Sequence, residues 1–416
     1  MMSKRILFCT FCLLALILSG CAGNAIPETT EPSLPETFHV EETEPSAEVT
    51  TPPETEPVLS ETEIILSQMT LREKVGQLFI ARIDALDPNR SASRIQDTVN
   101  DGVTALSNEI VTHYEDYPIG GVIHFAGNIK NPQQITELNR QLAEMASIPL
   151  FICVDEEGGM VARIGNNSAF SVPKFYSAGY TESTYDAALA RGQAIGQYLH
   201  EYGFNVDFAP VADVNTNPKN TVIGKRAFSS DAGTAAAMAA AFRNGLAQNN
   251  IIATFKHFPG HGDTYEDSHF GIAVSYKTAE EMALCEWLPF AEATSADFIM
   301  TGHIASPNIT GDMLPAAFSY RMITEILKGQ LGFSGLVITD SMQMEAITED
   351  YSSAEAAILA LQAGCDIILM PNDLEEAFDA VVAAVEDGRL SQQWLDETVL
   401  RILEFKVSHN LFESVT

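Results

Sequence analysis

Positively charged side chains are scarce in this chain of 416 residues. It carries 23 lysines and arginines against 56 aspartates and glutamates, a formal net charge of -33 at pH 7. Because phosphate backbones are bound mainly through lysine and arginine, this balance argues against a nucleic-acid partner. The hydrophobic content of 46% nevertheless suits a globular protein with a sizeable core. We therefore expect a folded, acidic protein whose charge serves solubility.

Cysteine is also rare, with six residues in all. Three belong to the first 21 residues, and the other three are dispersed along the chain: Cys153, Cys285 and Cys365. An odd number at irregular spacing does not predict a disulfide framework. Two of them lie inside apolar runs, so we expect reduced, buried thiols that act as small hydrophobic side chains.

The apolar run near the N-terminus, ILFCTFCLLALIL, is about half of the roughly 20 residues that a permanent membrane helix needs. It follows Lys4 and Arg5 and precedes LSGC, so residues 1–21 are predicted to be a signal peptide. A small residue pair directly before a cysteine resembles the bacterial lipobox, which predicts that Cys21 is lipidated. An ordinary secretory signal that ends near a cysteine is the alternative. We expect an extracytoplasmic protein that is attached by lipid alone to the outer face of a bacterial cell membrane.

Residues 22–60 are dominated by proline, glutamate, threonine and serine. A segment with so few bulky apolar side chains cannot bury enough surface to offset its chain entropy, so we expect it to be disordered. Its prolines and like charges favour an extended chain. It is either a stalk that holds a domain away from the membrane or a spacer without a length requirement.

Residues 61–416 alternate apolar segments with helix-like stretches, and we interpret them as one domain. Helices are predicted at residues 131–146, 185–203, 231–250 and 279–295. Near-continuous apolar strands between helices indicate a parallel sheet that is buried on both faces. Eight such units predict an α/β fold, a TIM-like (β/α)8 barrel, and a doubly wound open sheet is the alternative. The predicted strands are GQLFIARID, GGVIHFAGN, PLFICVDEE, FNVDFAPVAD, IIATFKHF, DFIMTGHI, GLVITDS and CDIILMP.

Polar residues follow the downstream ends of these apolar segments. In a closed barrel those ends share one face, where active sites are built from several strands. A polar residue at a strand end is otherwise a helix cap or a turn former, so no single one is informative alone. The residues in these positions are Asp84, Asn128, Asp155, Asp213, Lys256, His257, His303, Asp340 and Asn372.

Two of these carboxylates are candidates for chemistry. Asp340 follows four apolar strand residues, where a partly shielded, ionised carboxylate could act as a nucleophile. A cap for a helix that begins near Ser341 is the alternative interpretation. Asp155 ends the third strand, within VDEEGGMVARI, and is expected to point into the barrel mouth, where it could bind a pair of sugar hydroxyls. Arg163 and Arg226 could neutralise or orient such carboxylates.

The segment KHFPGHGDTYEDSHF, residues 256–270, contains three histidines and three acidic residues. Histidine and aspartate are zinc ligands, so a metal site is one interpretation. Against it, a proline and two glycines break any regular helical spacing of ligands, and the first strand has no His-x-His pattern. Asp267 and His269 instead suit an acid/base dyad, because a carboxylate fixes the tautomer of an imidazole whose ordinary pKa is near 6.5. We therefore expect no metal and no cofactor.

Four motifs follow one another along the chain: DEEGG, NTVIGKRAF, KHFPGHGDTYEDSH and GFSGLVITDSMQM. In this order they resemble the β-N-acetylglucosaminidase (β-hexosaminidase) branch of glycoside hydrolase family three, and the likeness extends from LREKVGQLF to the C-terminal helix. The resemblance implies a retaining, two-step hydrolysis on a barrel. Asp340 would be the nucleophile that forms a glycosyl-enzyme intermediate, and His269, assisted by Asp267, would be the acid/base. The positions implied to hold the terminal sugar are Asp155, Arg226, Lys256 and His257, with Arg163 supporting Asp155.

The resemblance implies a carbohydrate substrate, a terminal β-linked N-acetylglucosamine. A location outside the membrane suggests that this sugar comes from peptidoglycan fragments, and we expect a monomer. Three alternatives stay open: hydrolysis assisted by the substrate's acetamido group, a phosphorylase in which the histidine tolerates an incoming anion, and a two-lobed solute-binding lipoprotein without catalysis. The long segment after the first strand, residues 84–118, has no role in this interpretation.

Overall fold

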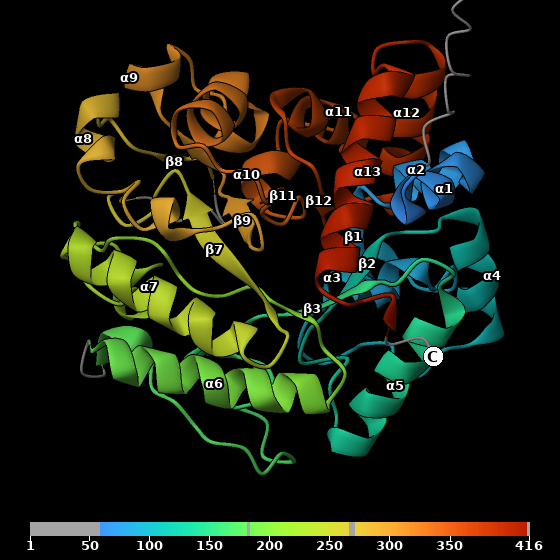
Figure 1. Ribbon diagram of the computed structural model, residues 1–416, viewed down its shortest axis with the longest axis horizontal. Helices are drawn as coiled ribbons and strands as arrows, with labels where there is room; N and C mark the ends of the chain where they lie inside the picture. Colours follow the sequence, from blue (N-terminus) through green and yellow to red (C-terminus); the bar gives the residue numbers. More distant parts are fainter. Residues whose placement is uncertain (1–58, 181–183, 266–270, 414–416) are drawn as a thin grey trace, which may run out of the picture. The chain divides into compact units, whose positions relative to one another are not determined.

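Eight parallel strands form the centre of the fold, in the order β11-β9-β7-β6-β3-β2-β1-β12. The computed structural model describes residues 59–180, 184–265 and 271–413, within a unit that spans Val58–Thr416 (Figure 1). Each of the eight segments predicted to be a strand contains one of these strands. Their bounds are β1 Phe79–Arg82, β2 Gly121–His124, β3 Phe151–Val154, β6 Val206–Asp207, β7 Ile252–Phe258, β9 Phe298–Thr301, β11 Leu336–Thr339 and β12 Ile368–Leu369.

The two end strands of this sheet, β11 and β12, meet and give a nearly closed barrel. Ile338 forms a parallel bridge with Ile367. The backbone N–H of Thr339 donates to the carbonyl of Ile367 at 3.0 Å, and the N–H of Ile367 donates to the carbonyl of Val337 at 3.1 Å. Because the strands follow one another around the barrel in chain order, the predicted TIM-like barrel is confirmed. The open doubly wound sheet and the two-lobed binding protein are not what this chain forms.

Helices surround the barrel, and their starts are set by polar caps. Asn131, Thr184, Asp231 and Asp373 each accept a backbone N–H of the first helical turn that follows, as N-cap side chains do. The helices are α1 Glu61–Gln68, α2 Leu71–Gly76, α3 Ala92–Gln96, α4 Asn108–Asp116, α5 Pro132–Met145, α6 Tyr185–Glu201, α7 Ala232–Ala247, α8 Ala279–Ala283, α9 Pro307–Thr310, α10 Glu345–Thr348, α11 Ser353–Ala363, α12 Leu374–Glu386 and α13 Gln392–Ser408, with a π-helix η6 at Arg321–Gln330.

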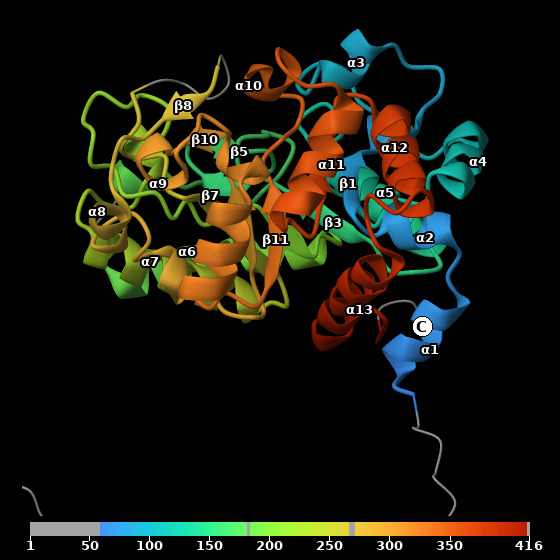
Figure 2. The same cartoon turned by 90° about the horizontal axis from the view of Figure 1, so that it is seen from above.

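The helices keep close to the barrel wall, so the faces of the strands are buried on both sides. Helices α6 and α7 lie side by side, and α1 and α2 lie beside α13 (Figures 1 and 2). Every residue of β1, β2, β3, β7, β9 and β11 is buried. None of the helices within the described ranges is both long and apolar enough to cross a bilayer.

The helix predicted at residues 279–295 is shorter than expected. Helix α8 ends at Ala283, and a 3-10 helix, η4, covers Phe290–Glu292. Pro289 lies between them, and proline has no N–H to donate to a helix interior. The apolar pattern therefore continued across a break that the proline imposes.

The end of the barrel away from the strand C-termini is closed by a buried lysine. The side chain of Lys406, on α13, donates to Gln77 Oε1 at 2.7 Å and to the carbonyl of Gly120 at 3.1 Å. Its amine lies 4.6 Å from the ring centroid of Phe151. Burial lowers the pKa of Lys406 to about 7.

Candidate active site

A cavity of about 560 Å³ lies at the C-terminal ends of the barrel strands. Six predicted site residues fall within the described ranges, and all six line this cavity although they come from five separate places in the chain. They are Asp155, Arg163, Arg226, Lys256, His257 and Asp340. The other three, Cys21, Asp267 and His269, lie outside the described residues.

Strand β7 carries two neighbouring residues into the same cavity. Along a regular strand Lys256 and His257 would face opposite sides. Here the register between β7 and β9 shifts between Lys256 and Phe258, a bulge that lets both side chains line the cavity. The peptide bonds Lys256–His257 and Phe258–Pro259 are cis.

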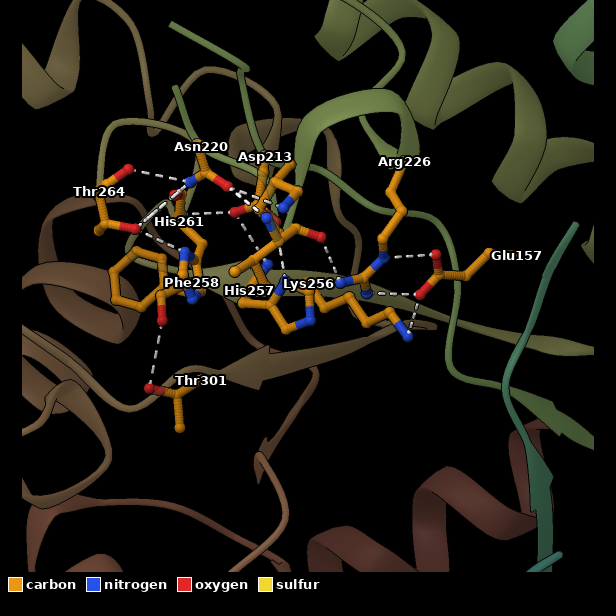
Figure 3. Close-up of polar contacts among 12 residues, drawn as sticks. Glu157, Asp213, Asn220, Arg226, Lys256, His257, Phe258, His261, Thr264 and Thr301 are labelled. Atoms are coloured by element: carbon orange, nitrogen blue, oxygen red, sulfur yellow. Dashed lines mark hydrogen bonds and ion pairs between the residues drawn. The ribbon is translucent and has the colours of Figure 1, made fainter. Parts of the chain in front are cut away.

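Lys256 lies at the centre of a buried network of charges. Its Nζ donates to Asp155 Oδ1 at 2.8 Å and lies 2.7 Å from Glu157 Oε1. Arg226 binds Glu157 through two bonds, Nε to Oε2 at 2.9 Å and Nη2 to Oε1 at 2.7 Å, so both cations converge on one carboxylate (Figure 3). Arg163 Nη2 lies 3.5 Å from Asp155 Oδ2. Arg163 thus forms an ion pair with Asp155 inside the cavity.

The charges of this network shift the pKa of Glu157. Burial would raise the pKa of its carboxyl, but the positive charges of Arg226 and Lys256 outweigh burial and hold it well below its ordinary range. Burial would lower the pKa of Lys256, but the negative charges of Asp155 and Glu157 outweigh burial and raise it. Glu157, Arg226 and Lys256 are therefore charged at neutral pH, and they present a fixed set of donors and acceptors to a ligand.

Glu157 is a site residue that sequence reasoning missed. In an extended segment, residues two apart face the same side. The prediction that Asp155 points into the barrel mouth therefore implies the same for Glu157. The intervening Glu156 points away and accepts the backbone N–H groups of residues 163–165 at 2.7–2.9 Å and the Tyr198 hydroxyl at 2.8 Å. Glu156 thereby fixes the hairpin of β4 (Glu156–Gly158) and β5 (Val161–Ala162), after which Arg163 follows.

A second carboxylate, Asp213, orients His257 from beneath. His257 Nδ1 donates to Asp213 Oδ2 at 2.7 Å, because a carboxylate can only accept. The other oxygen, Oδ1, accepts the backbone N–H groups of His257 at 3.2 Å and of His261 at 2.6 Å (Figure 3). Asp213 thus fixes the tautomer of His257, with Nε2 as the ring nitrogen that is not bound to the carboxylate.

Asp340 is half-buried where β11 ends. Its Oδ1 accepts the backbone N–H of the next residue, Ser341, at 2.7 Å. The following helix, α10, has Met344 as its N-cap and receives no side-chain cap. The alternative in which Asp340 caps a helix is therefore wrong, and its carboxylate is available to the cavity.

The surroundings of Asp340 keep it ionised. Burial raises the pKa of the carboxyl, but the charges of His257 and His303, the backbone N–H of Ser341 and the charge of Lys256 together hold it below its ordinary value. An ionised carboxylate among opposite charges is the state that a nucleophile or an electrostatic stabiliser requires.

The ends of the segment that carries Asp267 and His269 are tied to the barrel. Asn220 Nδ2 donates to the carbonyl of His261 at 2.7 Å and to that of Thr264 at 3.1 Å. Asp263 accepts the Ser275 hydroxyl at 2.9 Å, which links residues on either side of 266–270. His261 Nδ1 lies 2.7 Å from Thr264 Oγ1. His261 therefore shapes the start of this segment.

Five of the polar strand-end residues do not line the cavity. Asp84 and Asn128 bind one another beneath the loop that follows β1, and Asp213 supports His257. His303 is buried and contacts the carbonyl of Ser341 at 2.9 Å, whereas Asn372 is exposed and accepts from Gln96. Within the described ranges, no three His, Cys, Asp or Glu side chains are arranged to hold a metal ion.

Comparison with known proteins places this site in a family. Residues 70–405 match the model described as the glycosyl hydrolase family 3 N terminal domain. A β-hexosaminidase of Xylella fastidiosa (strain 9a5c) is 34% identical over 287 residues, covering 67% of this chain and 84% of that protein. Beta-hexosaminidase A of Pseudoalteromonas piscicida is 34% identical over 333 residues, but the match covers 73% of this chain and only 56% of the relative.

A solved structure agrees with these relatives. The family 3 β-N-acetylglucosaminidase of Paenibacillus sp. str. FPU-7 superposes with a TM-score of 0.74 at 34% identity, covering 83% of this chain and 63% of that one. This chain thus spans just over half of the first curated relative and under two thirds of this solved chain. The resemblance seen in the motifs is confirmed: the chain belongs to glycosyl hydrolase family 3.

Proposed function

We propose that this protein is a retaining exo-β-N-acetylglucosaminidase that removes a terminal β-linked N-acetylglucosamine. The observation that carries the proposal is one cavity in which an ionised Asp340 faces the charged group of Asp155, Glu157, Arg226 and Lys256. The β-hexosaminidase names of the relatives support the choice of sugar.

The barrel geometry suggests how a sugar lies in the cavity. In the order of eight strands, β11 and β3 are four places apart, so Asp340 and Asp155 stand on opposite sides of the mouth. In a pyranose ring, C1 and C4 are likewise opposite. With C1 at Asp340, the hydroxyls at C3 and C4 therefore reach Asp155, Lys256 and their partners, which offer both donors and acceptors.

The proposed reaction has two steps. The Asp340 carboxylate attacks C1 and forms a glycosyl ester while His269, oriented by Asp267, gives a proton to the leaving oxygen. His269 then takes a proton from water, which attacks C1 and breaks the ester with net retention of configuration. The ionised state of Asp340 and the polar side chains at the far end of the cavity support this division of roles.

Water is favoured over phosphate as the acceptor. Each described cationic side chain that lines the cavity is already paired with a carboxylate: Lys256 with Asp155 and Glu157, Arg226 with Glu157, and Arg163 with Asp155. A phosphate that attacked the glycosyl ester would have to compete with these carboxylates for the cations. Comparing the products formed with and without inorganic phosphate tests this, and a sugar phosphate among them would favour a phosphorylase.

Substitutions at the two catalytic positions test the proposal. Asp340→Ala should abolish turnover of every β-N-acetylglucosaminide, because the nucleophile is lost. His269→Gly should reduce hydrolysis of unactivated disaccharides much more than that of an aryl glycoside whose leaving group needs no proton. Equal losses on both substrates would contradict the acid role. A thiazoline inhibitor that binds tightly would instead favour assistance by the acetamido group.

The N-terminal segment and the sugar together support a proposal for the location and the natural substrate. We place the protein outside the cytoplasm, lipidated at Cys21 and acting as a monomer on peptidoglycan fragments. Cys21→Ala should release the protein from the membrane fraction. Purified wall fragments should lose terminal N-acetylglucosamine on incubation with the enzyme, and chelators should not change the rate.

A further inference from the structure

The loop that follows β1 forms one wall of the cavity. Residues 83–103 contain a 3-10 helix, η1 (Ile83–Leu86), and the short helix α3. Thr98 of this loop lines the cavity together with Ile123 of β2 and Phe125, which follows β2. The carbonyl of Thr98 also accepts the backbone N–H of Gly127 at 3.0 Å. The tip of the loop is therefore bound to the segment that follows β2.

A buried arginine holds this loop from within. Arg82 is only 1% exposed, and its guanidinium donates to the carbonyl of Ile95 and, at 3.2 Å, to that of Asp97. Nη2 also pairs with Asp84 Oδ2 at 2.9 Å. The bonds from Arg82 to the carbonyls of Ile95 and Asp97 fix residues 95–97 to the barrel wall. A surface loop does not otherwise need a buried charge to hold its shape.

Asp84 ties the two ends of the same loop together. Its Oδ1 accepts the backbone N–H of Val103 at 2.8 Å, and its Oδ2 accepts Asn128 Nδ2 at 2.8 Å. Arg90 Nη1 lies 3.2 Å from Asp84 Oδ1 and 3.1 Å from Asp101 Oδ1. The start, middle and end of the loop thus share one ion network, buried at Asp84 and Arg90 and reaching the surface at Asp101, which makes the loop a fixed wall.

This wall continues into the proposed sugar site through Phe125. The guanidinium carbon of Arg82 lies 5.5 Å from the ring centroid of Phe125, and that of Arg163 lies 5.2 Å from the same ring. Both distances fall within cation–π range. Arg163 in turn pairs with Asp155. Phe125 and Arg163 therefore line the cavity beside Asp155, and Thr98 lines it from the loop that follows β1.

We infer that residues 83–103, held in place by Arg82, restrict the enzyme to one terminal sugar. The inference rests on the proposed function: with C1 at Asp340, the O4 atom of the bound sugar points toward Asp155 and this wall. A further sugar attached through O4 would meet Thr98 and Phe125. Arg82 is a positioning residue here, because it acts through the loop and through Phe125 and does not touch the substrate.

An aryl β-N,N′-diacetylchitobioside tests the inference, because its first cleavage has two outcomes. The wild-type enzyme should release N-acetylglucosamine first and leave an aryl monosaccharide, so the aryl alcohol appears after a lag. Phe125→Ala and Arg82→Met should raise the share of first turnovers that release intact diacetylchitobiose and aryl alcohol by about tenfold or more, since even one methylene group in a pocket changes discrimination by about 10–200-fold. Quenched samples analysed by liquid chromatography give both products.

Arg94→Ala is the matched control, since Arg94 lies on the same loop but its side chain is 54% exposed and pairs with Asp101 on the outer surface. It should keep the wild-type product ratio. Folded, active Phe125→Ala and Arg82→Met proteins with the wild-type ratio would overturn the inference, as would a wild type that releases diacetylchitobiose in most of its first turnovers. If Arg82→Met does not fold, the product ratio of Phe125→Ala alone decides whether the wall excludes a second sugar. A wild-type enzyme that leaves an aryl β-N-acetylglucosaminide intact refutes the proposed function and the inference with it.

Discussion

The bidentate pair between Glu157 and Arg226 gives a quantitative test of the active-site network. Glu157 is 8% exposed, and its carboxylate receives two bonds from Arg226 and one contact from Lys256. Glu157→Gln removes the charge and keeps the shape, which leaves two cations close together in a buried site. Removing one partner of such a pair costs about 3–5 kcal/mol. Arg226→Gln should cost a similar amount, because it leaves the carboxylate with Lys256 alone.

A double-mutant cycle separates the interaction from the cost of each substitution. The variant with both changes should lose at least about 1.5 kcal/mol less than the sum of the single losses, because neither charge is then left unpaired. The free energy of unfolding is measured by urea denaturation followed by circular dichroism. Arg140→Gln is the control: Arg140 pairs with Glu137 and Glu144 on an exposed helix face, and its loss should not change stability measurably.

The pH dependence of this cycle is fixed by the direction of the shift. The folded pKa of Glu157 lies below its unfolded value, so its contribution is fully present above the ordinary glutamate pKa of about 4.3 and is lost as the pH falls below it. The difference between wild type and Glu157→Gln should therefore shrink on acidification. Single substitutions that cost less than about 1 kcal/mol, or losses that simply add, would refute a tightly coupled buried network.

Three further predictions concern other parts of the molecule. Lys406→Met removes a buried amine with a pKa of about 7. The stability of the wild type, measured by urea denaturation, should rise relative to this variant by about 3 kcal/mol between pH 7 and pH 9.5. A difference in stability that does not change with pH would contradict the low pKa. Asp213→Asn should lower kcat/KM for an aryl β-N-acetylglucosaminide about 10- to 100-fold because His257 loses its orientation, whereas Asp297→Asn, a buried carboxylate at the far end of β9, should leave it near the wild-type value. Among the cysteines of the barrel, a thiol reagent should modify the partly exposed Cys285 first, and slowly at neutral pH because burial raises its pKa to about 11; peptide mass spectrometry that finds another cysteine modified sooner would contradict this.

The barrel could be predicted from the sequence because its signal is local. Eight apolar segments separated by helical stretches indicate both the number of strands and their parallel arrangement. Polar caps such as Asn131 and Asp231 mark where helices begin. The break at Pro289 was the exception, since the helical pattern continued on both sides of it. Strand pairing around the barrel then follows from chain order.

Part of the candidate site could be predicted and part could not. Asp155, Lys256 and Asp340 end strands, so the barrel brings them to one face whatever the details of packing. Glu157 could have been predicted in the same way, because it lies two residues after Asp155. The role of Arg82 could not be predicted, because its partners at residues 95 and 97 are set by how a long loop folds back. No pattern of residue types encodes such a path.

Trapping the covalent intermediate is the sharpest test of Asp340 as the nucleophile. A fluorinated N-acetylglucosaminyl donor that forms the glycosyl ester quickly and hydrolyses it slowly is incubated with the enzyme, which is then digested and mapped by mass spectrometry. We expect one added sugar on the peptide that contains Asp340, and no label in Asp340→Ala. Label on another residue, or turnover without any labelled peptide, would contradict Asp340 as the nucleophile.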